Sequence, residues 1–227
     1  MEQAPLTVSE IVPVFPLPTA VLFPRTVLPL HIFEPRYREM VRDASAGDGV
    51  IAIALLKPGF ESDYEGSPEI HTVGTVGRIE ELVALPDGRF NLNLVGLVRV
   101  DLEELPSPHA YRIARARPRP EQDVDESDAE IHQAKLELLA SQGVLMHEIT
   151  SEGGPGLPLL EELPFPSAVN GSCANLPAEP RVRQQLLEID DLRARHRQVL
   201  HLVNQVLERV LELKQDQPPD PDEPGPN

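Results

Sequence analysis

The hydrophobic pattern changes halfway along the chain, from short apolar runs to longer stretches with a helical period. In the first half, prolines interrupt the apolar runs 11–15 and 27–33. Proline donates no hydrogen bond to a neighbouring strand, so the sequence predicts edge strands or bulged strands here. The prolines concerned are Pro13, Pro16, Pro18, Pro24 and Pro29.

A short helix and a buried strand follow this proline-rich opening. From Pro35 onward, apolar residues recur at spacings of three and four, which predicts a helix with Pro35 in its first turn and glycines at its end. Residues 50–56 form a continuous apolar run, typical of a strand that is buried on both faces. The helical stripe consists of Tyr37, Met40, Val41 and Ala44, and the terminating glycines are Gly47 and Gly49.

Three further strands complete the first half. Segments 72–85 and 89–100 are rich in Val, Leu and Ile, and Pro86-Asp87-Gly88 between them predicts a hairpin turn. Segment 111–117 alternates polar and apolar residues and predicts the last strand, while 57–68 is expected to be a loop. About six strands with one short helix favour a small, partly open barrel, in a domain spanning residues 8–120.

The second half is predicted to be helical, over residues 121–214. After an acidic connection, Ser127-Asp128-Ala129-Glu130 fits a capping box. A helical stripe continues from it, and residues 153–158 are expected to break that helix. The stripe consists of Ile131, Ala134, Leu138, Leu145 and Ile149.

The longest predicted helix runs from Pro180 to about Lys214, with an apolar residue every seven positions. Such a repeat must pack against another surface. The favoured interpretation is a helix within the chain's own bundle, and a homodimer formed through this helix is the alternative. The acidic, proline-rich segment 215–227 is predicted to be disordered. The repeat consists of Val182, Ile189, His196, Val203 and Val210.

The charge balance is strongly acidic. The formal net charge is −17 and the sequence pI is about 4.7, which disfavours binding to nucleic acids or to an anionic membrane surface. A single cysteine, Cys173, excludes an intrachain disulfide. The amino terminus has no signal-peptide pattern and no stretch is apolar enough to span a membrane, so we expect a cytoplasmic protein.

Several ordered motifs resemble the N-terminal, substrate-binding domain of Lon proteases. The resemblance is strong over about residues 10–118 and looser over 120–210. The motifs are VPVFPLP (12–18), VLFP (21–24), LPLHIFEPRY (28–37), VGTVGRI (73–79), PDGR (86–89), LVGLVRV (94–100) and RQQLLE (183–188).

This resemblance implies an α+β fold, a PUA-like β pseudobarrel with one short helix followed by an α-helical bundle that ends in a long helix. It also implies contact with unfolded proteins or peptides, and cereblon contains a similar domain. Within the shared motif, Phe23, Ile32 and Phe33 are expected to fill the core, while Glu34 or Arg36 could join the helix start to a strand.

Catalytic motifs of the complete Lon enzyme are absent from the sequence. There is no G-x-x-x-x-G-K-[ST] loop for ATP, and none of the three lysines fits a Ser-Lys dyad. We therefore expect a non-catalytic protein-binding module without cofactors, although domain homology could attract the label of a Lon-type peptidase. An adaptor that docks on a protease or another complex is one alternative, and an RNA-binding PUA-like protein is another.

Two groups of residues are candidates for binding. Phe60 and Tyr64 lie in the loop after the third strand, where aromatic side chains are least needed for the core, so they are candidate peptide contacts. Alternation along the last strand places Arg115, Arg117 and Arg119 on one face, where they could bind RNA or another anion. The favoured interpretation is a solvated face neutralised by acids of the segment 121–126.

Other reactive side chains carry weaker signals. His147-Glu148 begins like H-E-x-x-H, but position 151 is Ser, so no metal site is expected. His196 lies on the apolar stripe of the long helix and is expected to be a core histidine. Cys173 is expected to be a plain thiol in a flexible loop.

Overall fold

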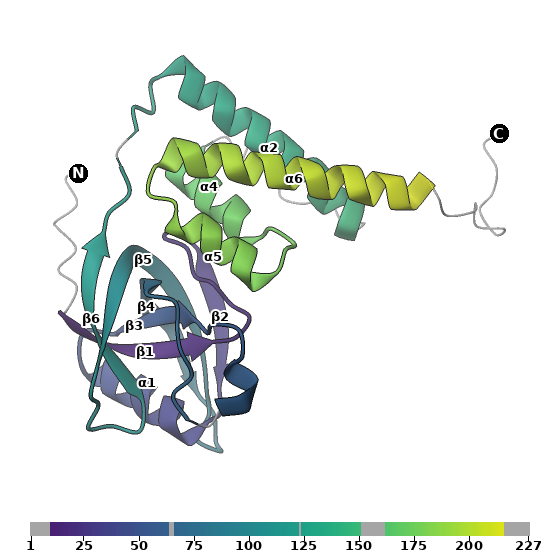
Figure 1. Ribbon diagram of the computed structural model, residues 1–227. Helices are drawn as coiled ribbons and strands as arrows, with labels where there is room; N and C mark the ends of the chain where they lie inside the picture. Colours follow the sequence, from purple (N-terminus) through teal and green to yellow (C-terminus); the bar gives the residue numbers. More distant parts are fainter. Residues whose placement is uncertain (1–9, 64–65, 123, 151–161, 216–227) are drawn as a thin grey trace.

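The computed structural model describes residues 10–63, 66–122, 124–150 and 162–215. A β-barrel forms the first half of this region and four helices form the second half (Figure 1). The elements are β1 (Ile11–Leu17), β2 (Val27–Ile32), α1 (Pro35–Ala46), β3 (Val50–Leu55), the 3₁₀ turn η1 (Phe60–Asp63), β4 (Val73–Ala84), β5 (Phe90–Leu105), β6 (Arg112–Arg119), α2 (Ala129–Thr150), α4 (Phe165–Ala174), α5 (Pro180–Glu188) and α6 (Leu192–Gln215).

The six strands form one sheet in the order β2-β5-β4-β3-β1-β6, which closes on itself because β5 also pairs with β6. Strand β5 is long enough to pair with two different strands along the same edge. Its first half pairs with β2 and its second half with β6. Strand β2 consequently lies outside the closed ring, at the edge of the sheet. The predicted barrel with one short helix is confirmed.

The proline-containing strand β1 was predicted to be an edge strand or a bulged strand. It is not an edge strand, because β1 lies between β3 and β6, and neither pairing shows a register shift. Residues 11–14 are in register with β6 and residues 14–17 with β3, so the two neighbours use successive halves of the strand. Glu10 accepts a hydrogen bond from β6, and Leu17 accepts one from Leu56 beside β3. By alternation, the backbone nitrogen of Pro13 points toward β3, just before the pairing with β3 begins. The backbone nitrogen of Pro16 points to the side of β6, after the pairing with β6 has ended. Neither proline therefore removes a hydrogen bond between paired strands.

Two other strand predictions are confirmed. All six residues of β3 are buried. Gly88 in the β4–β5 turn has φ +80, a conformation that glycine adopts without strain, and Leu85 donates to the carbonyl of Arg89 across the turn at 2.8 Å. The structure extends β5 to Leu105, five residues past the predicted end at Val100.

Helix α1 packs its predicted apolar stripe against the barrel. Tyr37, Met40, Val41 and Ala44 are its buried residues, and they share a cluster with Ile51 and other residues from β1, β3 and β5. At the start of α1, Arg36 pairs with Glu34 at 3.0 Å and lies over the ring of Tyr37.

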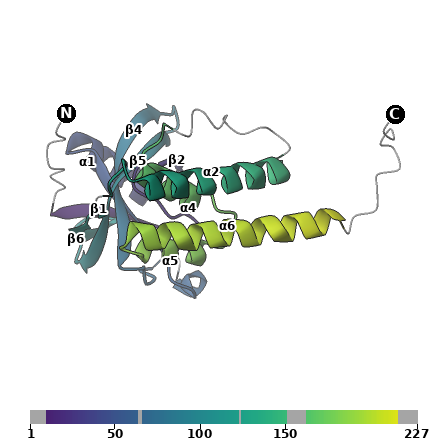
Figure 2. The ribbon, with the colours of Figure 1, turned by 90° about the horizontal axis from the view of Figure 1, so that it is seen from above.

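The helical part packs onto the barrel through one continuous apolar cluster. This cluster joins Phe23 and Val73 of the barrel to Leu138, Phe165 and Val199 of the helices. Seen from above in Figure 2, α2 and α6 run side by side and extend away from the barrel. None of the helices in these residue ranges is long and apolar enough to cross a membrane.

The long helix predicted from Pro180 to Lys214 is two helices, because the chain leaves the helix at Ile189 and re-enters it at Leu192. Asp191 caps the second helix, where its Oδ1 accepts from the backbone N–H groups of Arg193 (2.8 Å) and Ala194 (3.1 Å). The predicted packing of the apolar repeat within the bundle is confirmed for His196 and Val203, which are both buried.

Four local predictions need correction or fall outside the described residues. Cys173 was predicted to lie in a loop, but it is in α4 and is fully buried. This helix was not predicted because the sequence 165–174 has no strong apolar period. Asp128, not Ser127, accepts from Glu130 N at the start of α2, since the Ser127 hydroxyl is engaged by Asp125. The predicted helix break at 153–158 lies outside the described residues, as do residues 216–227 of the predicted disordered segment 215–227. At Gln215 the prediction of disorder is wrong, because this residue ends α6.

Candidate functional site

The outer edge of β2 is the site that the fold leaves open for binding. In the described part of the chain, no strand pairs with this edge. Thr26 accepts a hydrogen bond from Gly96 of β5, so alternation directs the backbone groups of residues 28, 30 and 32 toward β5. The backbone groups of Val27, Pro29 and His31 point outward, and they offer two N–H donors and three C=O acceptors, because proline has no N–H.

The same alternation sends the side chains of Val27, Pro29 and His31 to the solvated face of the sheet. Phe33 follows in this direction and is 60% exposed, although it was predicted to fill the core. Its neighbours in the motif, Phe23 and Ile32, are buried as predicted. The period of two along 27–33 was the signal that could have separated Ile32 from Phe33. We call the outward residues Val27, Pro29, His31 and Phe33, together with the backbone edge, the β2 surface.

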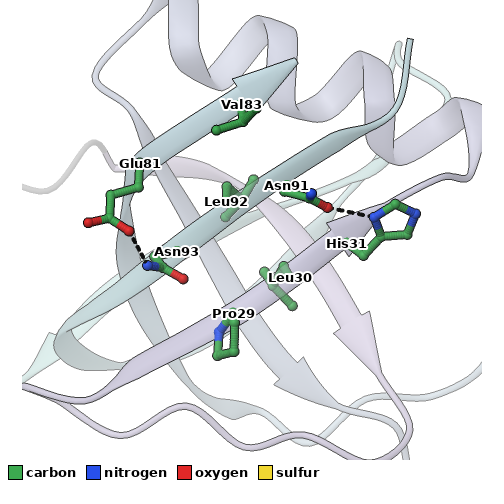
Figure 3. A pocket seen from close by; sticks show the side chains of 8 residues that line it. All are labelled: Pro29, Leu30, His31, Glu81, Val83, Asn91, Leu92 and Asn93. Atoms are coloured by element: carbon green, nitrogen blue, oxygen red, sulfur yellow. Dashed lines mark hydrogen bonds between the residues drawn. The ribbon is translucent and has the colours of Figure 1, made fainter. Parts of the chain in front are cut away.

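A shallow hollow of about 460 Å³ lies on the solvated face of β2, β5 and β4 (Figure 3). Its lining combines apolar side chains with amide and carboxylate groups. Val83 on β4 is 53% exposed and in register with Asn91, which is in turn in register with His31. The lining residues are Pro29, Leu30, His31, Glu81, Val83, Asn91, Leu92 and Asn93.

Hydrogen bonds hold the polar side chains of this hollow in place. His31 Nδ1 lies 2.6 Å from Asn91 Oδ1, and Arg89 donates to His31 Nε2 at 3.2 Å. Both contacts are satisfied by a ring that donates from Nδ1 and accepts at Nε2. Asn93 donates to Glu81 Oε2 at 2.6 Å (Figure 3). Glu81 has φ +51 and lies at an irregularity of the β4–β5 pairing, which turns its side chain toward the hollow.

Of the two aromatic loop residues proposed from sequence, Phe60 lies away from the β2 surface. Phe60, at the start of η1, is partly buried and packs against the apolar cluster of β1, β3, β4, β5 and β6. It also lines a separate open hollow of about 500 Å³ with Lys57, Pro58 and Pro68. Tyr64 lies outside the described residues.

Arg115, Arg117 and Arg119 lie in a row on β6, and each is paired with carboxylates. Arg115 contacts Glu10 (3.0 Å) and Glu103 (3.2 Å), Arg117 contacts Glu103 (3.0 Å), and Arg119 contacts Asp101 (2.9 Å) and Asp190 (2.7 Å). The hydrogen bonds that Arg115 donates to Glu103 and Glu10 raise the pKa of Arg115 above its ordinary value. The sequence predicted neutralisation by acids of the segment 121–126, but the partners are Glu103 and Asp101 of β5, with Glu10 and Asp190. Antiparallel pairing sets β5 beside β6.

The remaining reactive side chains have structural surroundings. His196 is buried, and its Nε2 lies 2.9 Å from the carbonyl of Ala134, which confirms a core histidine. Burial raises the pKa of the Cys173 thiol to about 12. Glu148 of the His147-Glu148 pair accepts from Lys214 at 2.7 Å.

Comparison with known proteins identifies the family. The sequence profile of the ATP-dependent protease La (LON) substrate-binding domain matches residues 11–205. The chain is 30% identical to the Lon protease of Flavobacterium johnsoniae over 207 residues, and 30% identical to Lon protease 2 of Sorangium cellulosum over 220 residues. These alignments cover 90% and 92% of this chain but 25% and 26% of the relatives, so the chain spans about a quarter of their length.

Solved structures show the same fold. The N-terminal domain of the Mycobacterium avium complex Lon protease superposes with a TM-score of 0.65 at 19% identity, covering 86% of this chain and 98% of that one. A Lon N-terminal domain protein from Xanthomonas campestris gives a TM-score of 0.61 at 24% identity, covering 84% and 97% of the two chains. Profile, relatives and fold agree, and the chain therefore belongs to the Lon substrate-binding domain family.

Proposed function

We propose that this chain is a non-catalytic module that binds extended segments of unfolded or partner proteins along the β2 surface. The observation that carries the proposal is a sheet edge that no described strand pairs with, beside exposed Val27 and Phe33, in a chain of the Lon substrate-binding family. A peptide can add to such an edge through main-chain hydrogen bonds, while alternate side chains contact the face beside it. Main-chain recognition is largely independent of sequence, which suits a receptor for many segments.

Pro29 limits how many backbone hydrogen bonds the β2 edge can form with an added strand. Its carbonyl remains available, but its missing N–H shortens the run of donors that a strand from another molecule could use. A proline at an edge position limits uncontrolled sheet extension. The edge therefore favours weak and reversible capture over tight pairing.

The test uses a fluorescently labelled, reduced and carboxymethylated α-lactalbumin as a permanently unfolded probe, with binding followed by fluorescence anisotropy. His31→Pro removes an outward N–H without removing a bond to β5, and we expect affinity about tenfold weaker, because one hydrogen bond is lost and the proline ring crowds the edge. His31→Ala is the matched control. It removes the side chain, keeps the donor, and should bind within about threefold of wild type.

A second pair of variants separates backbone capture from side-chain capture. Val27→Pro removes the other outward donor at a different position, and Phe33→Ser removes the largest exposed apolar side chain. All variants should first show a thermal transition close to that of wild type. Unchanged affinity in both proline variants would exclude strand addition, and unchanged affinity in Phe33→Ser as well would exclude the β2 surface as the binding site.

A second candidate role is docking through α6, either as an adaptor or as a homodimer. Leu211 and Leu213 are 39% and 51% exposed near the end of α6 that extends away from the barrel. Sedimentation velocity of wild type and of the double variant Leu211→Ser, Leu213→Ser tests the homodimer. A concentration-dependent dimer that the double variant abolishes supports it, and a monomer at all concentrations opposes it.

RNA binding has less support. Arg115, Arg117 and Arg119 each contact a carboxylate, so phosphate would have to displace existing ion pairs on a chain of net charge −17. RNA binding, if present, should weaken steeply as salt concentration rises. A filter-binding titration at two salt concentrations measures this dependence.

A further inference from the structure

Three side chains that can bind a metal ion meet where α1 packs beside the connection between β5 and β6 (Figure 1). Glu39 and Asp43 are four residues apart on α1, so their carboxylates project from the same face of the helix. His109 belongs to the β5–β6 connection. Its Nδ1 lies 3.8 Å from Glu39 Oε1 and 3.8 Å from Asp43 Oδ2, and the three atoms lie within 4.8 Å of one another.

The surrounding residues orient two of these three groups. Tyr111 is buried, its hydroxyl donates to Asp43 Oδ2 at 2.9 Å, and its ring stacks on His109 with centroids 4.7 Å apart and planes 11° apart. The backbone N–H of His109 donates to Ser107 Oγ at 3.1 Å, and Ser107 Oγ donates to the carbonyl of Tyr111 at 2.6 Å. A buried aromatic residue thus sets both the imidazole plane and the carboxylate position. Ligands of protein metal sites are commonly oriented in this way by residues behind them.

The distances between His109 Nδ1, Glu39 Oε1 and Asp43 Oδ2 fit binding of one shared ion better than direct hydrogen bonds between the side chains. At 3.8 Å, His109 Nδ1 is beyond hydrogen-bond distance of either carboxylate oxygen, so the side chains do not close the gap themselves. Bonds of about 2.0–2.2 Å to a single ion place neighbouring ligand atoms about 3–4 Å apart. An ion between the three groups would also neutralise two carboxylates that face each other across one helical turn.

We propose that Glu39, Asp43 and His109 bind a divalent transition-metal ion, with Zn²⁺ as the best fit. One imidazole nitrogen with two carboxylate oxygens suits Zn²⁺, whereas Mg²⁺ and Ca²⁺ prefer oxygen ligands alone. Three protein ligands leave a position for water, and the partial exposure of the site gives an ion direct access from solvent. The bound ion ties α1 to the β5–β6 connection, two segments more than sixty residues apart in sequence.

The test is isothermal titration calorimetry of the full chain with ZnCl₂ at neutral pH, after treatment with a chelator. We expect one site in wild type and affinity at least tenfold weaker in both Glu39→Gln and His109→Asn. His147→Asn is the matched control, because His147 is also exposed and next to an acidic residue, Glu148, but lies on α2. Its affinity should equal that of wild type.

A second readout guards against variants that bind poorly because they fold poorly. Zn²⁺ should raise the Tm of wild type and of His147→Asn, and it should leave the Tm of a folded His109→Asn unchanged. Co²⁺ bound to wild type should give visible absorption bands typical of low coordination number, and these bands should be absent in Glu39→Gln. Wild-type affinity in both Glu39→Gln and His109→Asn, or no heat of binding in wild type, would overturn the proposal.

Discussion

Prolines in the strands of this barrel lie where a backbone N–H would have no neighbouring strand to bond with, so the lack of an N–H costs no hydrogen bond. Pro13 and Pro16 lie in a central strand, yet each faces a side on which pairing has not begun or has already ended. Pro29 faces the outer edge of β2. The rule that proline indicates an edge strand therefore holds for individual backbone groups rather than for whole strands. It placed β2 correctly and β1 incorrectly.

The buried thiol of Cys173 should be unreactive in the folded protein. Burial raises its pKa to about 12, so the thiolate that attacks a disulfide reagent is scarce near neutral pH. We expect the reaction with Ellman's reagent at pH 8 to be at least about a hundredfold slower than in urea-unfolded protein. Rapid reaction under native conditions would show that α4 opens readily.

The raised pKa of the Cys173 thiol also determines how the stability of the protein changes at alkaline pH. The folded thiol keeps its proton to higher pH than the unfolded thiol, so its contribution is fully present below the ordinary value of 9.0 and is lost as pH rises toward 12.

The break between α5 and α6 shows how tertiary contacts interrupt a helical pattern. The apolar repeat runs through Ile189 without interruption, but the carbonyls of Leu187 and Ile189 accept hydrogen bonds from the buried side chain of Arg99. The carbonyl of Ile189 also accepts from Arg195 at 2.6 Å. Those carbonyls are unavailable to a continuing helix, and Asp191 starts a new one.

Removal of the Asp191 cap should destabilise the protein measurably. In Asp191→Ala, the N–H groups of Arg193 and Ala194 lose their acceptor, and we expect a loss of about 1 kcal/mol in the free energy of unfolding. Urea denaturation measures this difference. Asp191→Asn keeps an oxygen at the cap and should lose much less, so equal losses in the two variants would mean that charge, not capping, matters here.

The joint between barrel and helices is built on two fully buried arginines. Arg99, from β5, donates to Asp190 Oδ1 at 3.1 Å as well as to the two carbonyls at the helix break. Arg195, from α6, donates to Glu121 and to Asn170 Oδ1 at 2.7 Å. Burial, together with the nearby charge of Arg195, lowers the pKa of Arg99. These contacts position the helices on the barrel, beside the apolar cluster that both parts share.

Loss of Arg99 should therefore cost much more than loss of a surface arginine. Arg99→Ala leaves buried carbonyls without a donor and opens a cavity, and we expect a loss of about 2–4 kcal/mol in the free energy of unfolding by urea denaturation. Arg117→Ala is the comparison, since Arg117 is 69% exposed and its ion pair with Glu103 should contribute less than about 1 kcal/mol. Similar losses in the two variants would contradict this account of the joint.

Acid should weaken the same joint through Asp190. Its hydrogen bond from Arg119 lowers its pKa below the ordinary value of 3.8. A carboxylate with a lowered folded pKa contributes stability above the ordinary value, and that contribution is lost as pH falls below 3.8. The difference in Tm between wild type and Asp190→Asn should shrink as pH falls from 5 toward 2, and a constant difference would exclude this linkage.

Local patterns were sufficient to predict much of the fold. The stripe of Tyr37, Met40, Val41 and Ala44 located α1, the run 50–56 located β3, and Pro86-Asp87-Gly88 located the β4–β5 turn. Each of these signals depends on neighbouring residues and on the geometry of one element. The ordered motifs identified the family for the same reason, because they mark the turns and packed faces of one barrel.

Contacts between distant segments decided what local patterns could not. The pairing of β5 with β6 sets acids beside Arg115, Arg117 and Arg119, and Arg99 breaks a helix nearly ninety residues away. Glu39, Asp43 and His109 show no joint pattern along the chain, and only the packing of α1 beside the β5–β6 connection brings them together. Periodicity reports which face of an element is apolar, but the partner of each polar group depends on which elements meet, and that is a property of the folded chain.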